Sequence, residues 1–286
     1  MLLGSRDIVL GELLDLLTDQ QRELLLQASV STIPLSLDDL VIAVHGRKAD
    51  AVHRQQMATD VQRLLALTLL SPVPDRQITV HAWVADALRP YHGDGLPERH
   101  DRAFTMRDER ISSGRGRFED LTEACQHLAA NQRYDDLAGL ALAAAQSGIG
   151  MLATAALLGQ VAPTIPNDHP NYLAIVDREA QALLNTGNIG AAINRYQTVL
   201  QLLEKRAQAD PSNAQAQRDL SVSYNKLGDL SQAIGDTRQA EQFYRDSLAI
   251  RERLTLADPD NAQAQRDLSV VQERLETLLR GAQPNS

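Results

Sequence analysis

Cysteine, aromatic residues, glycine and proline are all scarce in this sequence. Its 286 residues include one cysteine, 16 glycines and 11 prolines, and aromatic side chains make up only 3%. The single Cys125 excludes an internal disulfide, and no basic segment with an apolar signal core follows Met1, so we expect a cytoplasmic protein. The shortage of turn-forming and aromatic residues argues against a β-rich fold and predicts an all-α protein.

Motifs that would indicate an enzyme are also missing. No Gly-x-x-x-x-Gly-Lys-Ser/Thr segment is present, so the chain has no phosphate-binding loop of its own. No histidine pair has metal-ligand spacing, and the two-residue separation of Cys125 and His127 places them on different faces of a helix. We therefore expect no catalytic residue, no metal site and no cofactor, and we expect Cys125 to be a small buried apolar residue.

Acidic residues outnumber basic ones, which gives a net charge of −9 and disfavours nucleic acid and anionic membranes as partners. Residues 137–162 carry no charge and are long enough to span a bilayer. Their many alanines and the central Gln146, Ser147 and Gly148 instead predict two soluble helices, at about 134–147 and 149–160, with Gly148 closing the first. We expect no membrane partner.

Six arginines are concentrated between residues 99 and 117, with acidic residues interspersed among them. They are Arg99, Arg102, Arg107, Arg110, Arg115 and Arg117. Mixed charges of this kind are typical of a solvent-exposed helix with salt bridges, so we expect a solvated helix here and no nucleic-acid contact.

An internal repeat dominates the C-terminal half. Residues 209–222 recur as residues 257–270, 48 positions later, and 13 of the 14 positions are identical. The same offset aligns Tyr196 with Tyr244, so an earlier and more diverged copy precedes these two. Apolar residues within a copy recur every three or four positions, and Gly235-Asp236 separates two such runs, which predicts a helical hairpin. Self-similarity of this length indicates a stacked array of hairpins.

The hairpin resembles a tetratricopeptide repeat (TPR). The resemblance rests on Tyr224, Leu227, Gly228, Gly235, Asp236, Ala240, Tyr244 and Ser247. Since the family's usual unit has about 34 residues, we expect longer helices here. The first copy has Ala180 where the family has glycine. The third has Gln272 and Glu276 in place of the large residue and the glycine, which predicts a terminal capping helix, with truncation inside a longer array as the alternative.

The resemblance implies a binding groove, lined by set positions on the first helix of each hairpin. At the 48-residue offset these positions are Asp177, Gln181, Asn225, Asp229, Glu273 and Thr277. The set is acidic and lacks the Lys, Asn and Arg combination by which some members of the family hold a C-terminal carboxylate. We therefore expect a basic or amphipathic peptide or protein partner. The alternative is that these six residues are ordinary surface residues.

The N-terminal third follows another pattern. It predicts helices at 8–17, 18–29, 36–45 and 58–70, extended segments near 68–73 and 77–81, and a further helix from 82. Helices followed by a hairpin, whose tip lies at 72–76, make a winged-helix topology. The predicted recognition helix, 59–70, offers one arginine, and six basic residues between 36 and 90 are balanced by six acidic ones, which argues against DNA reading.

This segment resembles the winged-helix subdomain of STAND signalling ATPases, the group that includes NB-ARC and NACHT proteins. The matching stretches are residues 13–17, 22–30, 64–71 and 79–84. In that group the histidine of a Met-His-Asp-like motif senses bound nucleotide, and His81 occupies its place, although Val80 and Ala82 flank it. The alternative is that His81 caps or packs against the helix that follows. The resemblance implies an ATPase module outside this chain, in cis or in trans.

These observations predict three domains: a winged helix at 1–92, a helical connector with degenerate TPR-like hairpins at 93–171, and a TPR-like α-solenoid at 172–286. The predicted function is a non-catalytic sensor and protein-interaction module of a STAND-type signalling or defence protein. One alternative is a freestanding TPR adaptor. A second is a winged-helix transcription regulator that would contact DNA through Arg47, Arg63 and Arg76.

Overall fold

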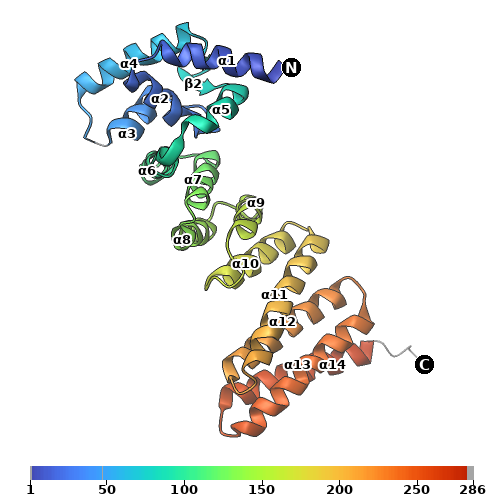
Figure 1. Ribbon diagram of the computed structural model, residues 1–286. Helices are drawn as coiled ribbons and strands as arrows, with labels where there is room; N and C mark the ends of the chain where they lie inside the picture. The colour runs from blue at the N-terminus through green and yellow to red at the C-terminus, as the bar shows by residue number, and fades with distance from the viewer. Residues whose placement is uncertain (1, 47, 282–286) are drawn as a thin grey trace. The chain divides into compact units, whose positions relative to one another are not determined.

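The computed structural model describes residues 2–46 and 48–281 (Figure 1). Over these ranges the protein is all-α except for one small two-stranded hairpin, as the composition predicts. The chain divides into two compact units, residues 1–140 and 141–286. The three domain boundaries suggested by the sequence stay predictions. No helix in the described ranges has the length and apolarity to cross a membrane.

The first unit begins with four helices: α1 (Leu2–Asp15), α2 (Asp19–Ser29), α3 (Leu37–His45) and α4 (Ala51–Ala66). Capping boxes start α2 at Thr18 and α3 at Ser36, in agreement with the predicted helix starts. The predicted bounds of the fourth helix, 58–70, were wrong. Asp50 starts this helix earlier, because its carboxylate accepts hydrogen bonds from the backbone N–H groups of Val52 and His53.

The predicted hairpin follows, formed by β1 (Leu70–Val73) and β2 (Gln77–Val80) with Leu70 opposite Val80. Leu35 adds an isolated bridge to Ile78 on the other side of β2. Helix α5 (Ala82–Leu88) comes next, as predicted. Leucine-rich faces of α1 to α5 and the hairpin form one hydrophobic core, which fixes the hairpin against α2 and α4.

Two short 3-10 turns lead into α6 (Leu96–Ser112), which is followed by α7 (Phe118–Ala130). The expected helix with salt bridges is confirmed, but the expectation that it is solvated was wrong at Arg107, whose side chain is 0% exposed. Its guanidinium donates to Glu123 Oε2 at 2.5 Å and to Asp120 Oδ1 at 2.9 Å. Glu123 also accepts a hydrogen bond from the backbone N–H of Ile33. These buried charges therefore tie α6, α7 and the segment before α3 together.

Helices α8 (Tyr134–Gln146) and α9 (Met151–Val161) follow, separated by Gly148 in the left-handed conformation (φ 87°). Both the helix pair and the role of Gly148 confirm the prediction. The uncharged segment is thus split into two helices of 13 and 11 residues.

The repeats form α10 (Tyr172–Asn185), α11 (Ile189–Ala209), α12 (Ala214–Ala233), α13 (Thr237–Ala257) and α14 (Ala262–Gly281). From α9 onward each helix packs against the next, so the predicted helical hairpins are confirmed. Helices α11 to α14 have 20 or 21 residues each, in line with the long repeat. Tyr196 and Tyr244 are buried, whereas Gln272 and Glu276 on α14 are exposed.

Candidate functional site

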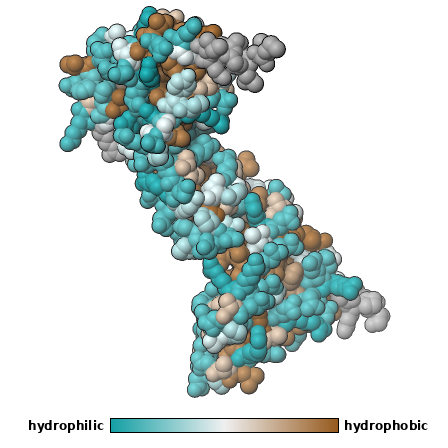
Figure 2. Space-filling model, in the orientation of Figure 1, coloured by the Kyte–Doolittle hydropathy of each residue, from teal (hydrophilic) through white to brown (hydrophobic). Residues whose placement is uncertain are grey.

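A hollow between α10 and α12, the first helices of two successive hairpins, is the candidate binding site of the repeat unit. It has a volume of about 260 Å³, and Val199 and Leu203 of α11 contribute to its lining. We call it the first groove. Its lining consists of Leu173, Ala174, Asp177, Val199, Leu203, Asp219, Val222, Ser223 and Lys226. Apolar and polar surface also alternate over this unit in the space-filling view (Figure 2).

The small side chain of Ser223 contributes to this hollow. The residues 48 positions before and after it are Ile175 and Val271, and both are fully buried. Ser223 is 3% exposed, and its Oγ atom has no hydrogen-bond partner within the described ranges. A side chain smaller than its equivalents in the neighbouring copies leaves space that the packing does not fill.

The corresponding place between α12 and α14 carries different side chains. Arg251 stands where the first groove has Leu203, and Ser247 stands where it has Val199. Arg251 is 4% exposed and forms an ion pair with Asp267, while the Ser247 hydroxyl donates to the backbone carbonyl of Ser221 at 2.9 Å. Burial lowers the pKa of Arg251, although Asp267 opposes this effect. The apolar floor of the first groove is thus replaced by polar groups with partners inside the protein.

A hollow of about 220 Å³ is lined by Arg251 and Asp267, the counterparts of Leu203 and Asp219 in the first groove. The rest of its lining comes from α12, α13 and α14 and from the segment between α13 and α14.

The charges of the first groove are distributed unevenly. Lys226 Nζ lies 2.5 Å from Asp177 Oδ1 and 5.4 Å from the ring centroid of Tyr196. Burial, together with Asp177, raises the pKa of Tyr196 to about 12, so its hydroxyl stays protonated. Asp219, in contrast, accepts a hydrogen bond from Gln215 Nε2 and forms no ion pair with a described residue. Asp177 therefore has a cationic partner within the protein, whereas Asp219 has none among the described residues.

Asp177 is the one member of the six predicted groove residues that lines the cavity. Gln181 accepts a hydrogen bond from the Tyr196 hydroxyl at 3.3 Å, and Asn225 Oδ1 is buried. Asp229 accepts from the Tyr244 hydroxyl at 2.7 Å and pairs with Arg274. Because Asp177 and Asp229 both have cationic partners, the predicted set is less acidic than its sequence suggests.

Glu273 and Thr277, the remaining predicted groove residues, lie exposed on α14. The apolar residues that line the first groove are not among the predicted groove residues. Comparison of the copies at the 48-residue offset would have revealed it, because Leu203 is replaced by Arg251 and Ser223 by Val271.

His81 is exposed at the position before α5, and its Nε2 lies 2.6 Å from the Ser71 hydroxyl oxygen. His81 is the N-cap residue of α5, but its side chain forms no capping hydrogen bond. It lines a hollow of about 1090 Å³ together with Trp83 and His92. Its role in nucleotide sensing stays a prediction.

Cys125 and His127 are both buried in α7. Burial raises the pKa of Cys125 to about 12, as expected for a packed thiol. Burial, together with His100 and Arg107, lowers the pKa of His127 to about 3. The described residues contain no cluster of three or more side chains suited to a metal ion.

The chain matches no protein-family model and no curated protein sequence. Among solved structures it is similar to a STAND protein with a tetratricopeptide repeat sensor from Pyrococcus horikoshii, at 12% identity and a TM-score of 0.35; the match covers 96% of this chain and 50% of that one. This chain therefore spans about half the length of that STAND protein.

Two further similar structures have comparable scores. One is a putative kinesin light chain with nearly identical TPR-like repeats from Podospora anserina, at 16% identity and a TM-score of 0.29, covering 70% of this chain and 95% of that one. The other is BtubC from P. vanneervenii, at 16% identity and a TM-score of 0.28, covering 94% of this chain and 95% of that one.

Proposed function

We propose that this chain is a non-catalytic protein-interaction module whose first groove binds a peptide segment of a partner protein. The observation that supports this proposal best is the difference between two duplicated sites. In the second copy, Arg251 takes the place of Leu203 and is paired with Asp267, whereas the first copy keeps an apolar hollow. An unfilled hollow loses packing energy in the free protein, and a ligand side chain could recover it.

The lining of the groove specifies the chemistry of the partner. Val199, Leu203 and Val222 offer apolar surface to one inserted side chain. Asp219 offers a carboxylate that no cation of the described chain neutralises. A peptide with an apolar residue next to lysine or arginine satisfies both features, in line with the expected basic or amphipathic partner.

We further propose that the module belongs to a STAND-type signalling or defence protein of the cytoplasm. In this role residues 8–91 act as a winged helix, His81 senses nucleotide, and partner binding in the repeats is relayed to an ATPase module in cis or in trans. Support comes from the sequence resemblance and from the order of helices and hairpin in the first unit. A freestanding adaptor is the alternative.

A DNA-binding role has less support. Arg63 and Arg76 are exposed, but Arg54 on the same helix as Arg63 is paired with Asp38. Arg47, which the sequence analysis also assigned to DNA contact, lies outside the described residues. Binding that falls steeply with salt and weakens in Arg63→Gln and Arg76→Gln would revive this alternative.

Peptide selection tests the groove directly. A random peptide library on phage is selected against the immobilised full chain, and enriched peptides are synthesised and titrated by fluorescence anisotropy. The test variant is Leu203→Arg, which copies Arg251 and brings a guanidinium near Asp219. The control is Leu203→Met, which keeps an apolar side chain of similar volume.

We expect the enriched peptides to share an apolar residue beside lysine or arginine. They should bind the wild type and Leu203→Met alike, and Leu203→Arg at least about tenfold more weakly, which corresponds to about 1.4 kcal/mol. Far-UV circular dichroism checks that both variants fold. If selected peptides bind Leu203→Arg with unchanged affinity, the first groove is not their site and the proposal fails.

The genomic neighbourhood separates the STAND role from the adaptor. A reading frame for a Walker-motif ATPase, fused to this chain or adjacent to it, supports the STAND role. A neighbourhood without one, in several genomes that carry the chain, favours the adaptor.

A further inference from the structure

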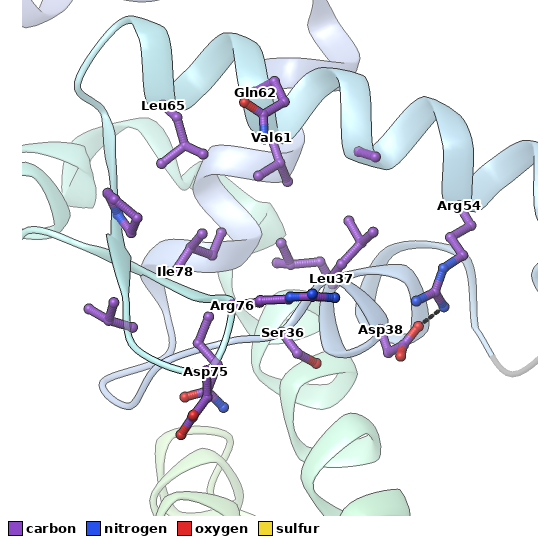
Figure 3. Close-up of a pocket in the computed structure, with 15 residues that line it drawn as sticks. Ser36, Leu37, Asp38, Arg54, Val61, Gln62, Leu65, Asp75, Arg76 and Ile78 are labelled. Atoms are coloured by element: carbon purple, nitrogen blue, oxygen red, sulfur yellow. Dashed lines mark hydrogen bonds and ion pairs between the residues drawn. The ribbon is translucent and has the colours of Figure 1, made fainter.

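A further candidate binding site lies in the first unit, between α3, α4 and the β1–β2 hairpin (Figure 3). It has a volume of about 550 Å³, which lies within the range of ligand pockets. We call it the hairpin pocket. Neither the predicted groove residues nor His81 line it.

Apolar side chains make most of its wall. Leu40, Val61 and Ile78 are buried at the base, and Leu37 and Leu65 are half-buried at its sides. These residues come from α3, α4 and β2, whose packing is fixed by the core of the unit. The pocket is therefore held by regular elements, so an occupant finds it already formed.

The pocket is elongated along α4. Its lining on that helix consists of Arg54, Ala58, Val61, Gln62 and Leu65, which follow one face of the helix. From residue 54 to residue 65 this face is about 16 Å long. An elongated apolar surface of this length matches a short peptide segment better than a compact small molecule.

Two arginines reach the pocket and differ in their pairing. Arg54 is paired with Asp38 at one end (Figure 3). Arg76 points from the hairpin into the pocket, toward Leu37, and forms no ion pair with a residue of the described chain. An uncompensated guanidinium beside apolar surface is a recognition element for a carboxylate.

The backbone that carries Arg76 is strained. Asp75 and Arg76 have φ values of 62° and 58°, which is the left-handed region at two successive residues without glycine. The β1–β2 ladder ends at Val73 opposite Gln77, so it encloses the three-residue turn 74–76 and holds Arg76 at the pocket.

We propose that the hairpin pocket binds a short acidic and apolar peptide segment of a partner protein. The apolar side chains of the segment lie along Leu37, Val61 and Ile78, and a carboxylate pairs with Arg76. This preference is opposite in charge to that of the first groove, so the chain has two peptide sites with different specificities. Asp38, which is paired with Arg54, and Asp75 also line the pocket, so the site accommodates one carboxylate at Arg76 better than a polyanion such as DNA.

Titration with designed peptides tests this proposal on the full chain. The probe is a fluorescein-labelled amphipathic peptide of about twelve residues, with leucine every third or fourth position and glutamate beside the leucine face. A matched probe has glutamine in place of each glutamate. The test variant is Arg76→Gln, with Arg76→Lys to restore the charge.

The control is Arg63→Gln, which removes an exposed arginine of α4 that does not line the pocket. We expect the acidic probe to bind the wild type and Arg63→Gln with equal affinity and Arg76→Gln about tenfold more weakly. Arg76→Lys should recover part of the lost affinity. The glutamine probe should bind the wild type about tenfold more weakly than the acidic probe.

Three results would overturn the proposal: equal binding of both probes, unchanged binding by Arg76→Gln, or no binding of the acidic probe at millimolar concentration. The Leu203→Arg variant shows whether the acidic probe binds here or in the first groove. The acidic probe should bind this variant normally, and a loss of binding would place the peptide in the repeats and not in the hairpin pocket.

Discussion

Gly228 on α12 lies directly against the ring of Tyr244 on α13. A Cβ atom at Gly228 would come within 2.6 Å of Tyr244 Cε1. The ring has little freedom to move away, because it is fully buried and its hydroxyl donates to Asp229 at 2.7 Å. The absence of a side chain at Gly228 therefore sets the close spacing of the two helices.

Gly228→Ala should destabilise the second unit by about 1 to 3 kcal/mol, because overpacking against the ring outweighs the better helix propensity of alanine. Urea unfolding followed by circular dichroism measures the change. The control is Gly139→Ala in α8. Gly139 is an exposed helical glycine, and an added Cβ atom would meet no neighbouring atom within 4 Å. This change should raise the free energy of unfolding by up to about 1 kcal/mol. A stabilising Gly228→Ala would contradict the packing argument.

Arg107→Met should lower the stability of the first unit by about 3 to 5 kcal/mol, because it removes the arginine paired with the buried Glu123 and one of the two arginines paired with Asp120. The measurement is urea unfolding monitored by the fluorescence of Trp83, which lies in the same unit. Arg89→Ala removes an exposed ion pair with Asp86 and should change stability by less than about 1 kcal/mol. Similar effects for the two variants would mean that the buried network contributes little.

The stability of the first unit should fall as the pH drops below about 6.5. Burial, and then His100 and Arg107, lower the pKa of His127 to about 3 in the folded protein. Between these two values the unfolded chain binds a proton at this histidine and the folded chain does not. The contribution of neutral His127 to the free energy of unfolding is therefore fully present above the unfolded pKa. As the pH falls below that value, this contribution is lost at up to about 1.4 kcal/mol per pH unit.

Unfolding free energies measured between pH 7 and pH 5 test this dependence. His127→Gln should reduce the slope, and a smaller slope should remain because burial also lowers the pKa values of His92 and His100. His53→Gln replaces an exposed histidine and serves as the control. An unchanged slope in His127→Gln would show that this residue titrates normally in the folded state.

Arg76→Gly should stabilise the first unit by about 1 kcal/mol, because glycine adopts the left-handed conformation of the turn without steric cost. Arg63→Gly makes the same chemical change inside α4 and should destabilise by about 1 kcal/mol. Thermal unfolding of both variants measures the two opposite effects. If Arg76→Gly lowers stability, the arginine side chain contributes packing that exceeds the strain of its backbone.

The sequence predicts the repeat architecture well, because the duplication at 48 residues reports the hairpin period directly. Gly148 and Gly235 were assigned correctly, since positive φ values favour glycine over other residues. The buried position of Arg107 was missed, because Asp120 and Glu123 compensate it from the next helix and a mixed-charge segment looks the same whether it is buried or exposed. The start of α4 differs from the prediction because the Asp50 cap begins the helix before its apolar residues do.

The first groove illustrates a different difficulty. Of the predicted residues only Asp177 belongs to it, since family positions identify one helix face and not the volume between three helices. That volume depends on Ser223 being smaller than Ile175 and Val271, which is a difference between copies. The hairpin pocket gave no sequence signal at all, because its wall combines α3, α4 and β2.

Ion pairs between successive hairpins follow the length of the repeat: Asp177 pairs with Lys226, and Arg218 pairs with Asp267, each 49 residues further along. Excision of residues 210–257 would bring Arg274 to the place of Lys226, so Asp177 would still face a cation. Unequal recombination between the near-identical segments could thus shorten or lengthen the array by whole hairpins while opposite charges stay in register. The same property makes the array a suitable scaffold for modular engineering.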